Sequence, residues 1–319
     1  MTTSTKNPMG PIDLVYLWVD GNDPDWIAKK IKYTGAIGDG SEGDCVGRYI
    51  SNDELKYSLR SAAKHAPWLR HIYIVTDNQR PDWLDVSHPT IKLVDHKEIL
   101  PPEIIPSFSA RVIEYFLYRI PGLSEHFLYA NDDMFFNAPL PPSYFFTPEG
   151  LPIVRLKRKR LAKWRYRIKR LIGKKLGQYA DALANAASMV EKKFGKYYSG
   201  IPHHNIDPYR KSDYQHAVED VFKDQVARSQ GNRTRAHGDL QRSAFSFYAL
   251  AIGHARLKYV GRKESSRILV YKHDFQKYME KYQPELFCLN DNQHVTDDDR
   301  LKIKPFLEAT FPQKSPFEK

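Results

Sequence analysis

The chain of 319 residues has only two cysteines, Cys45 and Cys288, and no long apolar stretch. Two cysteines are too few for a disulfide framework or a cysteine zinc site, although a single pairing between them stays open. No window approaches the ~18 consecutive apolar residues of a membrane-spanning helix, and the N-terminal residues 1–10 lack the apolar core of a signal peptide. We therefore expect a soluble, cytoplasmic protein.

Two common enzyme motifs are missing from the chain, and a third lacks its usual context. The chain has no G-x-S-x-G elbow and no phosphate-binding P-loop. A G-x-G-x-x-G string occurs at residues 38–43, but it does not directly follow the predicted strand over residues 12–19. Serine hydrolase, P-loop kinase and dinucleotide-binding dehydrogenase functions therefore lose their usual support. With 41% hydrophobic and 27% charged residues, the composition is that of a globular protein and excludes a disordered chain.

Acidic residues are absent from one stretch, residues 155–175, which contains twelve lysines and arginines. These cations exceed the net charge of +11, so the rest of the chain carries a net charge of −1. The basic character therefore belongs to this segment and not to the whole surface.

The apolar residues of the basic stretch share one face of a predicted helix: Leu161, Trp164, Ile168, Leu171 and Ile172. Such a helix can lie on an anionic membrane surface or hold a polyanionic polymer. It can also pack its apolar face on the domain and leave its basic face in solvent. We expect no nucleic-acid partner, because the segment has too few aromatic residues for base stacking.

The first half of the chain alternates strands and helices. Apolar, β-branched runs predict strands over residues 12–19, 71–76, 91–94 and 127–130. Helical spacing predicts helices over residues 51–66, beginning with a capping box from Ser51 to Glu54, and 108–120. This alternation predicts an α/β fold with a mainly parallel sheet flanked by helices.

The second half is less regular. We expect residues 155–190, 213–228, 239–255 and 297–310 to be helical, residues 268–271 and 286–289 to be strands, and residues 201–208 to form a loop. We expect the late strands to complete the same sheet. The chain is then a single domain over residues 1–319, with a basic amphipathic helical insertion at residues 151–200.

Acidic residues follow the predicted strands at Asp20, Asp77, Asp95 and the pair Asp132–Asp133. In parallel sheets, ligands bind beyond the carboxyl ends of the strands. Adjacent carboxylates repel unless a cation or proton neutralises them, and their oxygens suit Mg²⁺ or Mn²⁺, particularly when substrate phosphates complete the coordination. Single aspartates at such positions also serve as ordinary turn and cap residues.

Three further polar clusters could join this site. Asn290, Asp291 and Asn292 follow an apolar run and could share the same ion. His203 and His204 lie in a proline-flanked loop, and residues 233–239 supply arginines that can bind phosphate, with Asp239 to orient them.

Four blocks of the sequence together resemble the Stealth family of sugar-phosphate transferases, which includes bacterial capsular polysaccharide phosphotransferases. They are IDLVYLWVDGNDPDW from Ile12; RYISNDELKYSLRSAAKHAPWLRHIYIVTDNQRPDWL from Arg48, with its continuation to LYANDDMFF; PHHNIDPYR from Pro202 with RAHGDLQRSAFSFY from Arg235; and FCLNDN from Phe287. The chain departs from the family pattern at Asn292, where an aspartate is frequent, and this puts a metal role for that position in doubt.

The resemblance implies a Rossmann-like, glycosyltransferase-A-related catalytic core. It also implies transfer of sugar-1-phosphate from a nucleoside-diphosphate sugar, a UDP-hexose or UDP-N-acetylhexosamine, to a sugar hydroxyl of a glycan or polysaccharide acceptor. The products are a phosphodiester and a nucleoside monophosphate, in capsular or exopolysaccharide synthesis. The expected cofactor is Mg²⁺ or Mn²⁺, and the expected location is cytoplasmic, peripheral at the inner face of the membrane through residues 155–175.

The resemblance also implies roles for single residues. His204, Arg235 and Asp133 are expected to be catalytic, and Asp133 is expected to bind the metal together with Asn290 and Asp291. The nucleotide or donor sugar is expected to contact Trp18, Val19, Asp20, Gly21, Asp132 and Asp239.

Two other functions fit part of the pattern. An ordinary metal-dependent glycosyltransferase shares the strand-end carboxylates but transfers only the sugar and releases UDP. A non-catalytic protein that binds polyanions or membranes would use the basic helix alone, with the carboxylates as turn residues.

Overall fold

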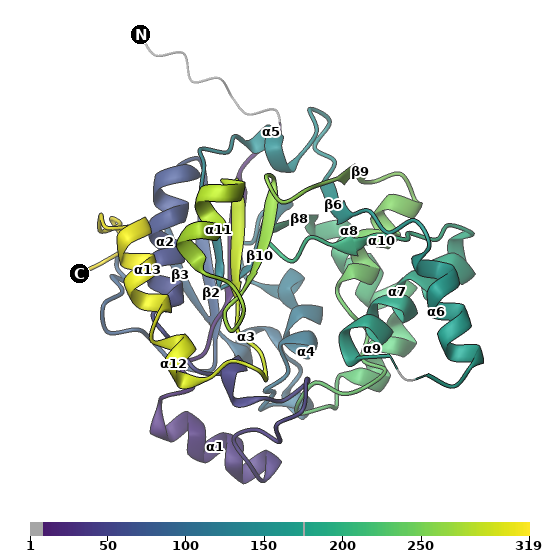
Figure 1. Ribbon diagram of the computed structural model, residues 1–319, viewed down its shortest axis with the longest axis horizontal. Helices are drawn as coiled ribbons and strands as arrows, with labels where there is room; N and C mark the ends of the chain where they lie inside the picture. Colours follow the sequence, from purple (N-terminus) through teal and green to yellow (C-terminus); the bar gives the residue numbers. More distant parts are fainter. Residues whose placement is uncertain (1–8, 175) are drawn as a thin grey trace.

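A computed structural model describes residues 9–174 and 176–319 (Figure 1). The expectations for residues 1–8 and for Lys175 lie outside this range. Within it the strands form three sheets. The central sheet has the strand order β3 (Ile91–Asp95), β2 (Ile72–Thr76), β1 (Ile12–Leu17), β4 (His126–Asn131), β8 (Asp207–Arg210). The second sheet has the order β10 (Ser265–Leu269), β11 (Leu286–Asn290), β5 (Met134–Phe136). The third sheet has the order β7 (Ile201–Pro202), β6 (Ile153–Lys157), β9 (Arg256–Tyr259).

Helices cover both faces of the central sheet. The α-helices of the described residues are α1 (Pro24–Thr34), α2 (Glu54–His65), α3 (His96–Ile99), α4 (Ala110–Tyr115), α5 (Pro142–Phe145), α6 (Ala162–Leu171), α7 (Gln178–Phe194), α8 (Lys211–His216), α9 (Lys223–Ser229), α10 (Ser243–Ala251), α11 (Phe275–Tyr282), α12 (Asp297–Arg300) and α13 (Ile303–Thr310). None of these described helices has the length and apolar character needed to cross a membrane.

Strand β1 lies at the centre of the main sheet and is buried along its whole length. It pairs in parallel with β2 on one side and with β4 on the other. Val15 packs in a cluster that includes α4, α7 and α10, whereas Leu14 packs in a cluster that includes α2. Because both faces are covered, the strand is apolar except for the buried Asp13, which pairs with Arg70 at 2.6 Å. The predicted α/β fold with a mainly parallel sheet is confirmed.

The late strands do not extend this sheet, so that expectation was wrong. After β4 the chain reverses at Asp132 and Asp133 and enters β5, which pairs antiparallel with β11 and thereby starts the second sheet. The edge of the central sheet beside β4 is instead taken by β8, which runs antiparallel. The sequence offered little sign of β8, because the strand is short and contains Pro208.

The basic segment is not one continuous helix, as residues 155–190 were expected to be. Arg155 belongs to β6, where it is only 1% exposed and its guanidinium donates to the carbonyl of Tyr144. Helix α6 ends near Gly173, whose left-handed φ of 67° breaks the helical path before α7 begins. Within residues 151–200, two separate helices therefore follow a strand of the third sheet.

Two local expectations near the N-terminus also need correction. The capping box from Ser51 to Glu54 does not form, because Asp53 adopts a left-handed conformation and the Glu54 carboxylate accepts from the amide of Asn52. Helix α1 was missed, although the Asp23 side chain caps it and Pro24 occupies its first turn. In the second half, α10 is shorter than the helix expected over residues 239–255, whereas α8, a π-helical segment and α9 together cover the helix expected over residues 213–228. Strand β10 begins three residues before the predicted strand at Ile268.

Candidate active site

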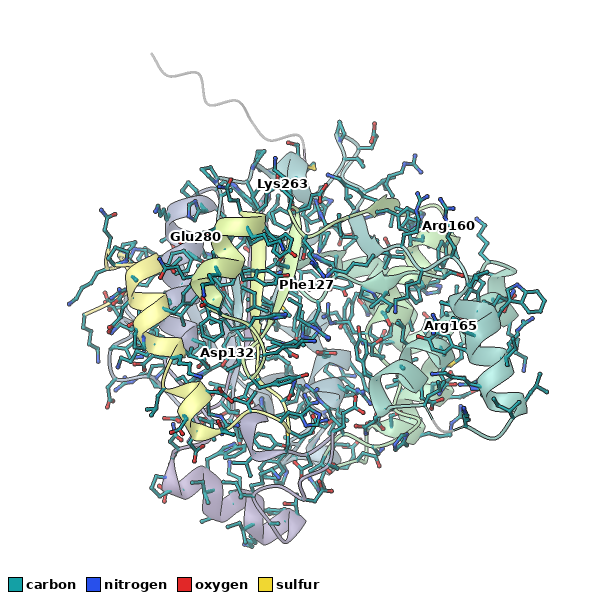
Figure 2. All side chains as sticks on the ribbon, in the orientation of Figure 1. Phe127, Asp132, Arg160, Arg165, Lys263 and Glu280 are labelled. Carbon is teal, nitrogen blue, oxygen red and sulfur yellow. The ribbon has the colours of Figure 1, made fainter. Side chains whose placement is uncertain are left out.

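The site is built on the sharp turn between β4 and β5. Asn131 ends β4, and Asp132 and Asp133 form the turn itself. Figure 2 labels Asp132. The Cys288 thiol donates to one carboxylate oxygen of Asp133 at 3.2 Å, while the other oxygen, Oδ1, is buried and has no hydrogen-bond partner among the described residues. The turn therefore holds a carboxylate oxygen that no described residue satisfies.

Two antiparallel pairings bring distant residues to this turn. In the first, Tyr129 on β4 lies opposite Asp207 on β8, so the residues just before β8 reach the carboxyl end of β4. In the second, Met134 lies opposite Cys288, and the amide of Leu289 donates to the carbonyl of Asp133 at 3.0 Å. His204 and Asn290 consequently meet, with 3.5 Å between Nε2 and Nδ2.

A buried polar network fixes the loop that carries His204. The ring of the neighbouring His203 is completely buried, with Nδ1 2.8 Å from the Ser265 hydroxyl and Nε2 2.9 Å from an oxygen of Asp207. Arg242 donates to the other oxygen of Asp207 at 3.0 Å. Burial would raise the pKa of Asp207, but hydrogen bonding to His203 and the charge of Arg242 hold it below its usual value. Asp207 is therefore a charged anchor at the start of β8.

His204 has a left-handed backbone, with φ of 58°. This conformation costs a residue with a side chain about 1–2 kcal/mol, so the surroundings must impose it. The fully buried neighbours His203 and Asn205 supply that constraint. The strained backbone directs the imidazole of His204 into the pocket.

Carboxylates crowd one side of the pocket. Burial and the nearby charges of Glu54 and Asp133 raise the pKa of Asp132 well above its usual value. Burial raises the pKa of Asp133 to about 7, opposed by the hydrogen bond from Cys288. The pKa of Glu54 is also raised, chiefly by burial. Such a cluster favours protons or a cation, and with the unpartnered oxygen of Asp133 these residues fit a hard divalent ion.

Arginines also line the site. Burial and the charge of Arg235 lower the pKa of Arg48 to about 10. Burial lowers the pKa of His204 to about 3, assisted by the charges of Arg267, Arg242 and Arg235. The imidazole is therefore neutral at physiological pH, and its surroundings favour an anion.

The third part of the pocket is aromatic. Trp26 packs against Tyr49 with ring centroids 5.3 Å apart and against the edge of Phe108 at 5.6 Å. Lys30 is fully buried behind them, where it pairs with Asp44 at 3.1 Å and lies over the Tyr49 ring. These rings line the same pocket as the carboxylates and the arginines. A ligand with a flat ring and a charged phosphate group would match a pocket that combines aromatic rings with charged side chains.

Most residues expected at the site line this single pocket: Trp18, Val19, Asp132, Asp133, His204, Arg235, Asn290 and Asp291. Asp291 is already engaged, because Arg300 binds both of its oxygens at 2.7 and 3.2 Å. Across the described residues, no three His, Cys, Asp or Glu side chains form a ready ligand set. A metal would therefore need amide oxygens or substrate phosphates to complete its coordination.

The other expected residues have supporting positions. Asp20 accepts from the amide of Asn22 at 2.9 Å and so shapes the turn after β1. The amide of Gly21 donates to Tyr49 at 2.8 Å, and a Cβ there would lie 2.1 Å from that carbonyl oxygen, so only glycine fits. Asp239 is buried and accepts from Asn232 and from the amide of Ala236, which shapes the loop that carries Arg235.

Two other strand-end acids also serve the fold. Asp77 pairs with Lys29 at 2.8 Å, and Asp95 caps α3. Sequence reasoning missed the pocket residues Glu54, Arg48 and Trp26, although all three lie within the Stealth-like blocks. No spacing rule distinguishes them from helix, loop or core residues, because their convergence depends on the tertiary fold.

Fold and pocket together define an α/β protein with a pocket for a charged ligand at the carboxyl ends of its parallel strands. The chain belongs to the Stealth family, as its sequence blocks predicted. Residues 10–38 match the family description "Stealth protein CR1, conserved region 1", and residues 48–154 match "Stealth protein CR2, conserved region 2".

Whole-chain relatives agree with this assignment. The receptor polysaccharide phosphotransferase WefC of Streptococcus oralis is 32% identical, over 97% of this chain and 100% of its own length. The capsular polysaccharide phosphotransferase WcwK of Streptococcus pneumoniae is 31% identical, with the same coverage. An exopolysaccharide phosphotransferase of Streptomyces coelicolor is 36% identical, but this chain spans only 52% of its length.

Among solved structures, the galactosyltransferase LgtC in complex with donor and acceptor sugar analogs aligns with 94% of this chain and 96% of its own. The TM-score is 0.46 and the sequence identity is 12%.

The network behind His204 generates a stability prediction. Asp207→Asn removes the charge that both Arg242 and His203 face, so we expect the free energy of unfolding to fall by about 3 kcal/mol. Urea denaturation at neutral pH measures this loss. The control Asp220→Asn removes an exposed partner of His216 and should cost less than about 1 kcal/mol. Equal effects of the two variants would contradict the anchoring role of Asp207.

Proposed function

We propose that the chain transfers sugar-1-phosphate from a nucleoside-diphosphate sugar to a hydroxyl of a glycan acceptor, in capsular or exopolysaccharide synthesis. The printed names of WefC and WcwK, which are polysaccharide phosphotransferases, support this reaction class. The observation that carries the proposal is the single pocket shared by His204, Asp133 and Arg235. It combines a neutral imidazole, a carboxylate pair and phosphate-binding cations.

The reaction moves one phosphorus centre from donor to acceptor. The acceptor oxygen attacks the phosphorus that bears the sugar, and a new phosphorus–oxygen bond forms. The bond from that phosphorus to the oxygen bridging the two phosphates breaks, so nucleoside monophosphate leaves. Little covalent help is needed from the protein, which must position the groups and neutralise charge. Arg235 and Arg48 would neutralise the phosphate oxygens.

His204 would accept the proton of the attacking hydroxyl at Nε2. Among the described residues, this nitrogen lies 3.5 Å from Nδ2 of Asn290, and we assign the amide as the donor and Nε2 as the nitrogen without a proton. Without ligand, burial and neighbouring arginines hold its pKa at about 3. Two donor phosphates would offset the charge of Arg235 and Arg267, which raises the basicity of the imidazole as the substrate binds.

The carboxylate side would hold the cofactor. Asp132 and Asp133, together with the amide oxygen of Asn290, would bind Mg²⁺ or Mn²⁺. The ion would supply charge neutralisation for the pyrophosphate. Asp291 would contribute less than the sequence suggested, because Arg300 occupies both of its oxygens.

The aromatic side would hold the nucleobase. Trp18 and Val19 line the pocket beside Trp26, Tyr49 and Phe108. A uracil base and a UDP-hexose or UDP-N-acetylhexosamine donor are our proposal from the family pattern. Asp20, Gly21 and Asp239 would act on the donor indirectly, through the loops that they shape.

The products of the reaction test the proposal. The protein is incubated with a panel of UDP-sugars, an oligosaccharide acceptor and Mg²⁺, then analysed by phosphorus NMR and mass spectrometry. We expect a phosphodiester signal and released UMP, both abolished by EDTA. Release of UDP would instead identify an ordinary glycosyltransferase, and the absence of any turnover would favour a binding protein.

The imidazole of His204 generates a second test. His204→Asn removes the base but keeps a residue that tolerates a left-handed backbone, so we expect turnover to fall by about 10²–10⁴-fold while donor binding is retained. Steady-state kinetics and calorimetric titration of the donor separate the two effects. His216→Asn, at an exposed position on α8, is the matched control. Wild-type turnover in His204→Asn would contradict the assignment.

Helix α6 is oriented opposite to an ordinary amphipathic surface helix. Its apolar residues point outward, with Trp164 60% and Leu171 85% exposed. Its cations partly face inward, where Lys163 pairs with Glu191 and Arg170 pairs with Asp181 of α7. The alternative in which the basic helix packs its apolar face on the domain is therefore wrong.

We propose that this apolar stripe inserts into an anionic membrane surface. Figure 2 shows Arg165 of this helix, and Arg160 just before it, in a part of the molecule away from Asp132. Exposed cations around an apolar stripe are typical of helices that lie in the headgroup region. The protein would then be peripheral at the inner face of the cell membrane.

Substitution of the stripe tests the membrane proposal. In Trp164→Ser/Leu171→Ser, we expect the fraction sedimenting with phosphatidylglycerol vesicles to fall by about tenfold or more, because two large apolar side chains no longer insert. The control Ile31→Ser/Leu301→Ser changes two other exposed apolar residues and should bind normally. Unchanged sedimentation of the stripe variant would overturn membrane insertion by α6.

A further inference from the structure

A second basic feature lies apart from α6. We call it the basic groove: it runs between the end of β6 at Lys157 and Arg158, strand β10 at Arg267, and the segment through α11 that carries Lys272, Lys277 and Lys281. Figure 1 shows α11 beside β10, and Tyr278 of α11 packs in the same buried cluster as Ile268 of β10. Seven lysines and arginines line the groove, against the single acid Asp274.

The positive charge of the basic groove is largely uncompensated within the protein. Arg267, Lys272 and Lys281 are exposed, and none of them forms an ion pair with any residue that the structure describes. Lys277 reaches only its helix neighbour Asp274, at 3.4 Å. Burial lowers the pKa of Lys157, assisted by the charges of Arg267 and Arg262. Cations that repel one another in this way are stabilised by an anion from outside.

The basic groove is continuous with the active site. Arg267 and Leu269 line the groove and also line the chamber that contains His204, Arg235 and Asn290. Arg267 is moreover one of the charges that lower the pKa of His204. A chain whose end reaches His204 can therefore extend past Arg267 into the groove.

We propose that the basic groove binds the acceptor, and that the acceptor is an anionic chain carrying phosphodiester groups rather than a neutral glycan. The proposal rests on the proposed sugar-phosphate transfer. Each transfer adds one negatively charged phosphodiester to the acceptor, next to the sugar whose hydroxyl reacts in the following transfer. When the product becomes the next acceptor, these charges lie beyond Arg267, beside Lys272, Lys277 and Lys281. A neutral glycan would gain nothing from these cations.

Binding of labelled inorganic polyphosphate to the full chain tests this site. The groove variant is Lys272→Ala/Lys277→Ala/Lys281→Ala. The control variant, Lys192→Ala/Lys193→Ala/Lys223→Ala, removes the same charge from exposed positions on α7 and α9. In fluorescence anisotropy, we expect the dissociation constant of the groove variant to rise at least about tenfold, and its salt dependence to fall by about two logarithmic units per decade of salt. The control variant should stay near wild type.

Each alternative has its own outcome. Equal weakening of the two variants would show that only total charge matters, and would overturn the proposal. Loss of phosphatidylglycerol vesicle binding with unchanged polyphosphate binding would make the groove a membrane site instead, which also overturns it. UMP release from UDP-sugars is measured separately on the wild type. If no donor is turned over, the proposed reaction fails, while the polyphosphate result still decides whether the groove binds phosphate chains.

Discussion

The site depends on two antiparallel pairings that flank the turn at Asp132 and Asp133. Parallel strands alone would present only the ends of β1, β2 and β4 at this edge. Because β8 runs against β4, its beginning lies at the same edge and brings His204 there. Because β11 runs against β5, its end brings Asn290 to the same place. One sharp reversal of the chain thus gathers side chains from three regions more than 70 residues apart.

The pocket keeps opposite charges apart instead of pairing them. Asp132, Asp133 and Glu54 supply carboxylates, Arg48 and Arg235 supply cations, and His204 supplies an imidazole to the same pocket. Each side is destabilised by its own repulsion, as the pKa directions of Asp132 and Arg48 indicate. A ligand that brings both a cation and a pyrophosphate would relieve the repulsion among the carboxylates and the repulsion among the arginines. The same reasoning extends to the basic groove, whose cations would be neutralised by the phosphodiester charges of a longer substrate.

The sequence predicted the parts of the structure that depend on local pattern. The buried run from Ile12 to Leu17 and the acidic end of β4 were evident from residue types alone. Features set by tertiary packing were not evident. The strand containing Pro208 has no local signal, and the inverted orientation of α6 follows from acids on α7 that attract its cations. The hydrogen bond from the Ala236 amide to Asp239, which shapes the loop around Arg235, was likewise not evident from the sequence.

The central claim is that the phosphorus–oxygen bond breaks and the bond between the sugar and its phosphate survives. A donor labelled with oxygen-18 at the atom joining the anomeric carbon to phosphorus tests this directly. We predict by mass spectrometry that the label stays in the phosphodiester product and that the released nucleotide is an unlabelled monophosphate. Recovery of the label in a released nucleoside diphosphate would mean that the sugar alone was transferred, and would contradict the account.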